Sequence, residues 1–283
     1  MAYDRDSFLA GLAVGRTLWK PHTISLLPVP KYRFSYTLGW DSSFDYRIYM
    51  YATGLVVVDW GDGTSTEVEA STAGGMTTFL HSYASAGTFS VTIKIYDWAN
   101  ELRIGSLFSN GNGKYVRSLD SPLPSCVTRL EGFCVGGTNL QSIPSNLFAQ
   151  VTNINNVTQA FASCGITDIP IGLFDNCPNL RSFDGCFANT PITSIPPGLF
   201  DYCTQATRFD SIFSGCGYLR SIPLGLFENC PSVSSFYEAF NGCGSIGSSV
   251  PELWVAYPSA NGVRCFAGCV NAVNYADIPY NWR

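Results

Sequence analysis

Cysteine offers the most chemistry in this chain, because its 283 residues include 11 cysteines but only 2 histidines. Thiols at this density could form disulfides, bind a metal or stay reduced. No Cys-x-x-Cys pair occurs, and two histidines are too few to complete several zinc sites. An odd number of cysteines also cannot pair completely within one chain. We therefore predict mostly buried free thiols, packed as small apolar groups in tight turns, and no metal site.

Seven of the cysteines fall into two rows that recur at a fixed interval. One row holds Cys177, Cys203 and Cys230, and the other holds Cys164, Cys216, Cys243 and Cys269, with Thr190 in the place of one member. Cys164 and Cys216 are two intervals apart, which is about 9.6 Å if neighbouring turns stack at strand spacing. That distance exceeds the roughly 7 Å that a disulfide can bridge. Free thiols are consistent with folding in a reducing compartment.

Histidine and carboxylate patterns give little support for catalysis. His22 stands beside Pro21, and His81 lies in a His-Ser-Tyr segment where a structural hydrogen bond is expected. The run DWGDGT at 59–64 lacks the alternating ligands and distal glutamate of an EF-hand. We expect its aspartates to cap backbone N–H groups of a turn. Because no nucleophile has a credible base beside it, we predict neither an enzyme nor a cofactor.

The interval is about 26 residues, and three sets of landmarks keep it from about residue 116 to the C-terminus. Ile-Pro recurs at 143, 169, 195 and 222, Leu-Phe at 147, 173, 199 and 226, and phenylalanine at 161, 187, 213, 240 and 266. A repeat this short cannot bury its own apolar face, so its copies must stack into a solenoid. We expect these phenylalanines, and the row Phe183, Phe209 and Phe236, to form core columns. Trp282 is expected to plug the last turn.

Strand signals precede the repeats at 46–51, 55–60, 77–83 and 89–97, with turn signals between them. Several short strands of this kind indicate a small β-sandwich. The segments WGDGT at 60–64 and HSYASAGTFSV at 81–91 resemble the PKD domain family, whose fold is an immunoglobulin-like sandwich. This resemblance covers about residues 34–98.

The repeats resemble the BspA-like leucine-rich repeats of bacterial surface proteins and mycoplasma lipoproteins. The shared order is Leu-Phe, Asn-Cys, Leu-x-Ser-Phe, Phe-x-Gly-Cys and Leu-x-Ser-Ile-Pro, and it spans about residues 105–283. An insertion, GSIGSSVP at 244–251, interrupts the rows. The resemblance implies adhesion.

These observations predict a mostly β chain with short helices, in which an Ig-like (PKD) β-sandwich is followed by a leucine-rich-repeat solenoid. The predicted divisions are an N-terminal amphipathic helix and linker at 1–25, the sandwich at 26–104, and the solenoid at 105–283 with about six turns of about 24–28 residues. Phe8, Leu12 and Trp19 share one face of the helix. The helix is expected to pack on the neighbouring domain or to serve as a docking peptide, and it resembles N-terminal segments of prophage-encoded proteins.

The charge and hydropathy of the chain limit the classes of partner that are expected. Charged residues make up 13% of the chain and the net charge is -5; after Lys114 there is no lysine, and seven arginines face eleven acidic residues. Nucleic acid is therefore not expected as a partner, because phosphate binding needs clustered basic residues. The apolar run at 8–15 is too short to span a bilayer and follows an acidic stretch, so we expect no signal peptide and no membrane insertion. Cytoplasmic synthesis is expected, with later association with a virion or a cell surface.

Recognition is then the expected function, carried by outward side chains between the landmarks. They form two rows, one with Gln141, Thr167, Thr193 and Arg220 and one with Arg181, Asp184, Asp210, Tyr237 and Glu238. Carboxylates of the second row could pair for glycoside hydrolysis, but an acidic stripe on a solvated face is the plainer interpretation. We predict a non-catalytic adhesion protein that presents this solenoid face to a protein or glycan receptor on a cell surface. The alternative is a structural, tail-associated virion protein of a phage or prophage.

Overall fold

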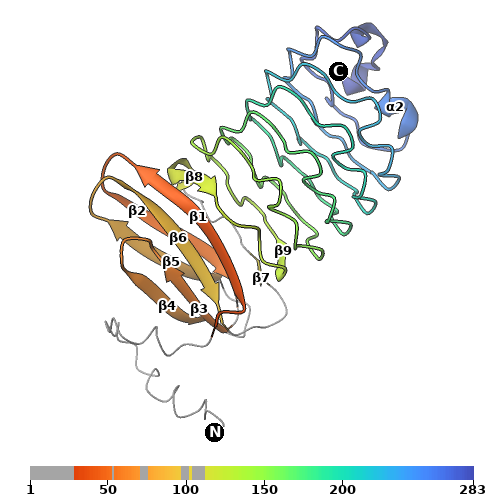
Figure 1. Ribbon diagram of the computed structural model, residues 1–283. Helices are drawn as coiled ribbons and strands as arrows, with labels where there is room; N and C mark the ends of the chain where they lie inside the picture. Colours follow the sequence, from red (N-terminus) through yellow and green to blue (C-terminus); the bar gives the residue numbers. More distant parts are fainter. Residues whose placement is uncertain (1–28, 53, 71–75, 97–101, 104–111) are drawn as a thin grey trace.

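The computed structural model describes residues 29–52, 54–70, 76–96, 102–103 and 112–283 (Figure 1). The predicted N-terminal helix with Phe8, Leu12 and Trp19 lies outside these residues. Strands gather at one end of the described part, and successive turns stack away from them toward the C-terminus. Strands and extended turns dominate, and helix is limited to short segments. The predicted mostly β class is confirmed.

Two β-sheets form the N-terminal part. In spatial order, the first contains β4 (Ser65–Ala70), β3 (Gly54–Asp59), β6 (Gly87–Ile95), β1 (Tyr32–Trp40) and β8 (Val116–Leu119). The second contains β5 (Met76–Tyr83), β2 (Phe44–Tyr51), β7 (Leu102–Arg103) and β9 (Val127–Arg129). All pairs are antiparallel except β7 with β9. The four predicted strands correspond to β2, β3, β5 and β6, whereas β1 and β4 were not among the predicted strands.

Trp60 is the largest fully buried side chain of this part. Its indole N–H donates to the Thr66 hydroxyl at 2.9 Å, and the Tyr83 hydroxyl donates to its carbonyl oxygen at 2.9 Å. The His81 ring stacks on the indole, with ring centroids 4.9 Å apart and planes 10° apart. The structural hydrogen bond predicted for His81 is confirmed as well, because its Nε2 bonds a carboxylate oxygen of Asp62.

The turn after β3 is held by its aspartates, as predicted. The Gly61 N–H donates to Asp59 at 3.2 Å and the Thr64 N–H donates to Asp62 at 3.0 Å. The second carboxylate oxygen of Asp62 lies 2.7 Å from His81 Nε2. Partial burial raises the pKa of Asp62, but the hydrogen bonds from Thr64 and His81 outweigh burial and hold that pKa below its ordinary value.

Beyond the sheets, parallel β-bridges join each turn to the next. They run along one row, Arg129, Asn156, Ser182, Arg208, Ser235 and Asn261. We call residues 127–283 the repeat stack. Each turn contributes backbone N–H groups that donate to carbonyl oxygens of a neighbouring turn, as from Phe183 to Arg208 at 3.0 Å. The backbone of the stack is thereby paired across turns, and bonds between residues three apart, as from Cys186 to Phe183 at 2.9 Å, add pairing within each turn.

Aromatic columns fill the interior of the repeat stack. Along the column Phe161, Phe187, Phe213, Phe240 and Phe266, neighbouring ring centroids are 5.5–5.7 Å apart and planes differ by 5–20°. All five rings are fully buried. The parallel column Phe183, Phe209 and Phe236 has spacings of 5.0 and 5.9 Å. The core role predicted for these phenylalanines is confirmed.

All eleven cysteines are free and buried. In one row the thiols donate to backbone carbonyl oxygens of the preceding turn, at 3.0–3.2 Å, from Cys164 to Cys134, Cys216 to Phe187, Cys243 to Phe213 and Cys269 to Phe240. Thr190 replaces a cysteine there and donates to the Phe187 carbonyl at 2.7 Å. Burial raises the pKa of Cys164 and Cys269 to about 12. The row therefore consists of protonated thiols that each provide a hydrogen-bond donor.

The sheets and the repeat stack share one continuous core. Strand β8 pairs with β1, and β9 follows it into the first turn. The Phe34 ring of β1 lies 5.9 Å from the Phe133 ring of that turn. The sheets therefore cover the N-terminal end of the stack.

The other end is closed by short helical segments. They are α2 (Leu253–Ala256), η3 (Tyr275–Asp277) and η4 (Tyr280–Trp282); a fourth, η2 (Asn112–Tyr115), precedes β8. Trp282 is buried, its ring lies 6.4 Å from Trp254 and from Phe236, and its carbonyl accepts the Phe266 N–H at 2.8 Å. The predicted C-terminal plug is confirmed. Among the described residues, no helix combines the length and apolar character needed to cross a membrane.

We expect the thiols to be unreactive in the folded protein, because burial raises their pKa values and the thiolate is the nucleophile. Titration with a thiol-specific disulfide reagent should show slow reaction in native buffer and about eleven thiols in denaturant without reductant. A finding of one free thiol or fewer after denaturation would contradict the assignment.

We expect Gly262→Ala to displace the terminal plug. A Cβ at Gly262 would lie 2.0 Å from the Trp282 ring, so the indole must move. Overpacking of this kind costs about 1–3 kcal/mol. The variant should unfold at lower denaturant concentration and its tryptophan fluorescence should shift to the red. Gly247→Ala is the matched control, because a Cβ there meets open space; equal losses in both variants would refute the plug.

Candidate functional site

The bridge row presents a continuous polar surface, which we call the ladder face. In extended backbone, residues i and i+2 point to the same side. The ladder face therefore combines the bridge residues with those two positions later, Glu131, Thr158, Asp184, Asp210, Tyr237 and Val263. Between the two positions lies the buried core residue of each turn, such as Phe183 or Phe209. Core packing thus fixes which side chains face outward.

Bridge residues of several turns bind the backbone of their own turn. The side-chain oxygen at the bridge position accepts the N–H two residues later, from Thr158 to Asn156 at 2.7 Å, Asp184 to Ser182 at 3.5 Å, Tyr237 to Ser235 at 3.4 Å and Val263 to Asn261 at 3.2 Å. Short polar side chains suit this local bond. The side chains of these bridge residues are therefore used in hydrogen bonds within the fold.

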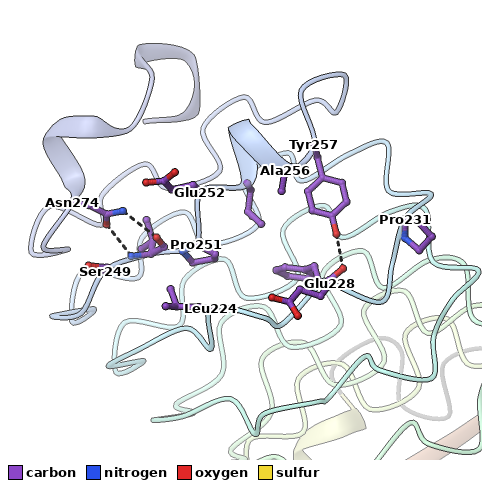
Figure 2. A pocket seen from close by; sticks show the side chains of 12 residues that line it. Leu224, Glu228, Pro231, Ser249, Pro251, Glu252, Ala256, Tyr257 and Asn274 are labelled. Carbon is purple, nitrogen blue, oxygen red and sulfur yellow. Dashed lines mark hydrogen bonds between the residues drawn. The ribbon is translucent and has the colours of Figure 1, made fainter.

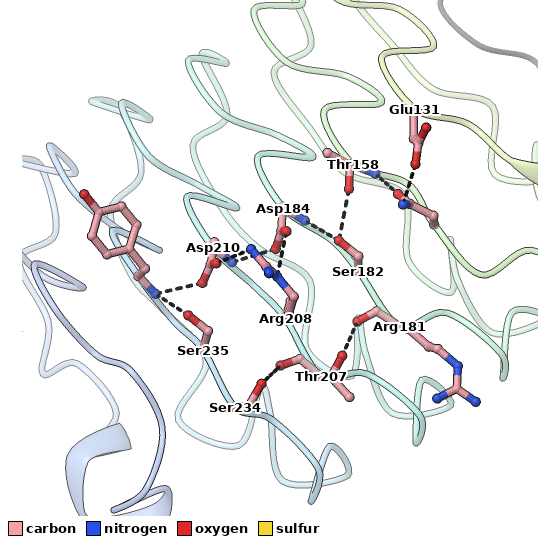
Figure 3. A network of polar contacts seen from close by, with 12 residues as sticks. Glu131, Thr158, Arg181, Ser182, Asp184, Thr207, Arg208, Asp210, Ser234 and Ser235 are labelled. Carbon is pink, nitrogen blue, oxygen red and sulfur yellow. Dashed lines mark hydrogen bonds and ion pairs between the residues drawn. The ribbon is translucent and has the colours of Figure 1, made fainter.

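Arg208 lies at the centre of the ladder face (Figure 3). Its Nε is 2.9 Å from Asp184, and its Nη2 is 2.7 Å from Asp210. The same carboxylates reach the next turn, because Asp184 accepts the Asp210 N–H at 3.1 Å and Asp210 accepts the Tyr237 N–H at 3.0 Å. One guanidinium and two carboxylates thereby join three successive turns.

The pKa of Asp184 shows why the two carboxylates need the positive charge of Arg208 beside them. Burial raises the pKa of Asp184 above its ordinary value, the Arg208 charge lowers it, and the nearby Asp210 charge raises it. Both carboxylates already accept bonds from the guanidinium and from backbone N–H groups. The arrangement holds turns in register and leaves neither carboxylate free as a general base.

A second feature of the ladder face is a column of left-handed backbone. Gln159, Ser211, Glu238 and Arg264 have φ of 53–58°, and Gly132 and Gly185 occupy the same position in other turns. This conformation costs a non-glycine residue roughly 1–2 kcal/mol. Glu238 also pairs with Arg264 of the next turn at 3.3 Å. Polar side chains are thus held outward at strained positions where glycine would be easier to accommodate.

The structure brings one predicted row together and separates the other from it. Arg181, Asp184, Asp210, Tyr237 and Glu238 lie on or beside the ladder face. In the other row, Thr193 donates its N–H to Thr167 and Arg220 donates to Thr193, both at 3.2 Å, which forms a second backbone ladder. Gln141, Thr167 and Arg220 are exposed and Thr193 is half-buried. The nine residues therefore belong to two surfaces.

Two of the predicted residues on or beside the ladder face have side chains that make no hydrogen bond or ion pair within the described structure. Arg181 uses its backbone in the ladder, and its guanidinium extends away from the polar network (Figure 3). Tyr237 is 38% exposed, and its hydrogen bonds to the described residues are made by its backbone, through its N–H and through its carbonyl oxygen, which accepts the Ser211 N–H at 2.7 Å. By contrast, Asp184 and Asp210 are half-buried and bonded. Arg181 beside the ladder face and Tyr237 on it are therefore exposed side chains that a partner can contact.

Sequence reasoning missed Arg208, although it organises the face. The signal was its position two residues before Asp210, since alternation places both side chains on one side. Within the described ranges, no group of three or more histidine, cysteine, aspartate or glutamate residues is placed to hold a metal ion.

We expect Arg208→Met to destabilise the protein by about 1 kcal/mol at pH 7, since the charge network is partly exposed. Without the guanidinium, the folded-state pKa of Asp184 rises further above its unfolded value. A carboxyl with a raised pKa destabilises the fold above that pKa, and the cost is lost as pH falls and the group protonates. Urea unfolding at pH 7 and pH 4 should show the deficit shrinking in acid. Arg181→Met should show little loss at either pH, and equal, pH-independent losses would contradict the network.

Comparison with known protein families finds one family that matches part of this chain. The model described as "BspA type Leucine rich repeat region (6 copies)" matches residues 130–250. The comparison with curated proteins gives no match. Among solved structures, "Crystal structure of TLR13-ssRNA13 complex" is similar at 15% identity and a TM-score of 0.19, covering 52% of this chain and 30% of that chain. This chain thus spans less than a third of that protein, and a likeness this remote carries no argument.

The resemblance predicted from the Leu-Phe, Asn-Cys and Ile-Pro landmarks is confirmed where it is matched: residues 130–250 are similar to BspA-type leucine-rich repeats.

Proposed function

We propose that this chain is a non-catalytic recognition protein whose ladder face binds a protein partner. One observation carries the proposal: Arg181 and Tyr237 stand on a backbone fixed by cross-turn bonds, and neither side chain is engaged within the described structure. Arginine and tyrosine are enriched among the residues that dominate protein interfaces. Leucine-rich repeats of the matched family support a protein-binding role.

The backbone that carries Arg181 and Tyr237 is held rigidly, which favours binding through these side chains. Asp210 accepts the Tyr237 N–H, and Arg208 holds Asp210 in place. The Arg181 carbonyl accepts the Thr207 N–H at 2.9 Å and the Thr207 hydroxyl at 3.2 Å. Positions fixed in advance lose little conformational entropy on binding, which favours affinity. Proteins built from stacked repeats commonly bind along such a surface.

The proposal includes the architecture around this face. We infer that β1 to β8 form an Ig-like, PKD-like sandwich and that the repeat stack is a solenoid. The two-sheet arrangement and the parallel bridges between turns support this interpretation. The sandwich would then act as a spacer that presents the ladder face to a receptor on a cell surface.

Parallel screens on a protein array and a glycan array test the proposed function. We expect saturable binding to arrayed proteins, reduced at least tenfold by the double substitution Arg181→Ala and Tyr237→Ala, because exposed arginine and tyrosine side chains often dominate the binding energy of an interface. Tyr202→Ala is the matched control, since Tyr202 is 59% exposed but lies away from the bridge row. Binding only to glycans, or protein binding that the double variant leaves intact, would contradict the proposal.

A further inference from the structure

The regular stacking of one aromatic column stops near the C-terminus. Ring centroids of Phe148, Phe174, Phe200 and Phe227 follow one another at 5.2, 6.3 and 5.6 Å. The next turn carries Trp254 at this position, and its ring packs toward the C-terminal end, 6.3 Å from Phe266 and 6.4 Å from Trp282.

In place of Trp254, Tyr257 contacts the preceding turn. Its hydroxyl donates to the Phe227 carbonyl oxygen, and its ring lies edge-on to Phe236 with centroids 5.2 Å apart. The inserted segment 244–251 and α2 separate this turn from the regular pattern. The column is thereby opened on its outer side.

A groove of about 780 Å³ lies at this break (Figure 2). Leu224, Pro231, Pro251 and Tyr257 supply apolar surface to it, and Leu224 is 69% exposed. Val250, which also lines the groove, is fixed by two hydrogen bonds with Asn274 of the last turn, at 2.9 and 3.0 Å. The groove has the size of a ligand site and a wall held in place.

Two carboxylates, Glu228 and Glu252, also line the groove from its two sides. Both residues are exposed, and in the described part of the chain no lysine, arginine or histidine forms an ion pair with either. The repeat region as a whole has few cations, with no lysine after Lys114. The groove therefore offers negative charge beside apolar surface.

We propose that this groove binds a short peptide segment that carries both basic and aliphatic side chains. The carboxylates complement lysine or arginine, and the wall of leucine, proline and tyrosine takes the aliphatic groups. The site is separate from the ladder face, because none of its lining residues belongs to the bridge row or the row two positions later. It adds a second partner contact to the proposed recognition function.

Fluorescence anisotropy with a fluorescein-labelled pentapeptide of alternating leucine and lysine tests this site on the full chain. We expect saturable binding that weakens with added salt and falls at least tenfold when Glu228→Gln and Glu252→Gln are combined. The same peptide with glutamate in place of lysine should not bind. Asp175→Asn is the matched control, because Asp175 holds the position of Glu228 two turns earlier and is equally exposed.

The outcomes separate this site from the ladder face. Arg181→Ala with Tyr237→Ala should leave pentapeptide binding unchanged, whatever that variant does on the protein array. Thermal unfolding should give the Glu228→Gln and Glu252→Gln variant the melting temperature of the parent. Equal binding of the acidic peptide, or of the basic peptide to the double glutamine variant, would overturn the proposal.

Discussion

Contact between successive turns is the constraint on which the rest of this structure depends. A single turn of about 26 residues has its phenylalanines on one side and unpaired backbone groups along its edge. Stacking solves both problems at once, since rings such as Phe187 and Phe213 meet at 5.7 Å and the backbone pairs across turns. The two ends then need covers, which the sheets provide through Phe34 and the C-terminus provides through Trp282.

This constraint also uses up most of the reactive side chains. Thiols such as those of Cys216 and Cys269 donate to carbonyl oxygens of the preceding turn, and the Thr190 hydroxyl donates to the Phe187 carbonyl of its own turn. Asp184 and Asp210 accept N–H groups of the following turn. A carboxylate or thiol committed to the backbone is unavailable for catalysis, so the sequence is richer in reactive residues than the folded surface. Exposed side chains that make no such bond include Arg181 and Tyr237 at the ladder face and Glu228 and Glu252 at the groove.

The fixed repeat interval explains which features could be predicted from the sequence. The phenylalanine columns and the buried cysteines follow from a fixed interval, because equivalent residues must stack. Strand β4 carries glutamates on its exposed side, with Val68 as its only large apolar residue, so its strand pattern is weak. Strand β1 does alternate, with Phe34, Tyr36 and Leu38 buried, and it was missed because it begins within a proline-containing segment. Arg208 was missed because its partners lie both two residues away and one turn away. The division at 1–25, 26–104 and 105–283 stays a prediction, while β8, from the predicted repeat region, pairs with β1.

Recognition in such a fold depends on local departures from the repeat. Where every position matches its counterpart, side chains pack on each other and little is left to contact a partner. The ladder face departs from regularity in its column of positive φ, where four turns place Gln159, Ser211, Glu238 and Arg264 and two turns have glycine. The groove departs from it through an insertion that turns Trp254 away from Phe227. Regular turns therefore supply a rigid frame, and its irregular positions determine what the frame can bind.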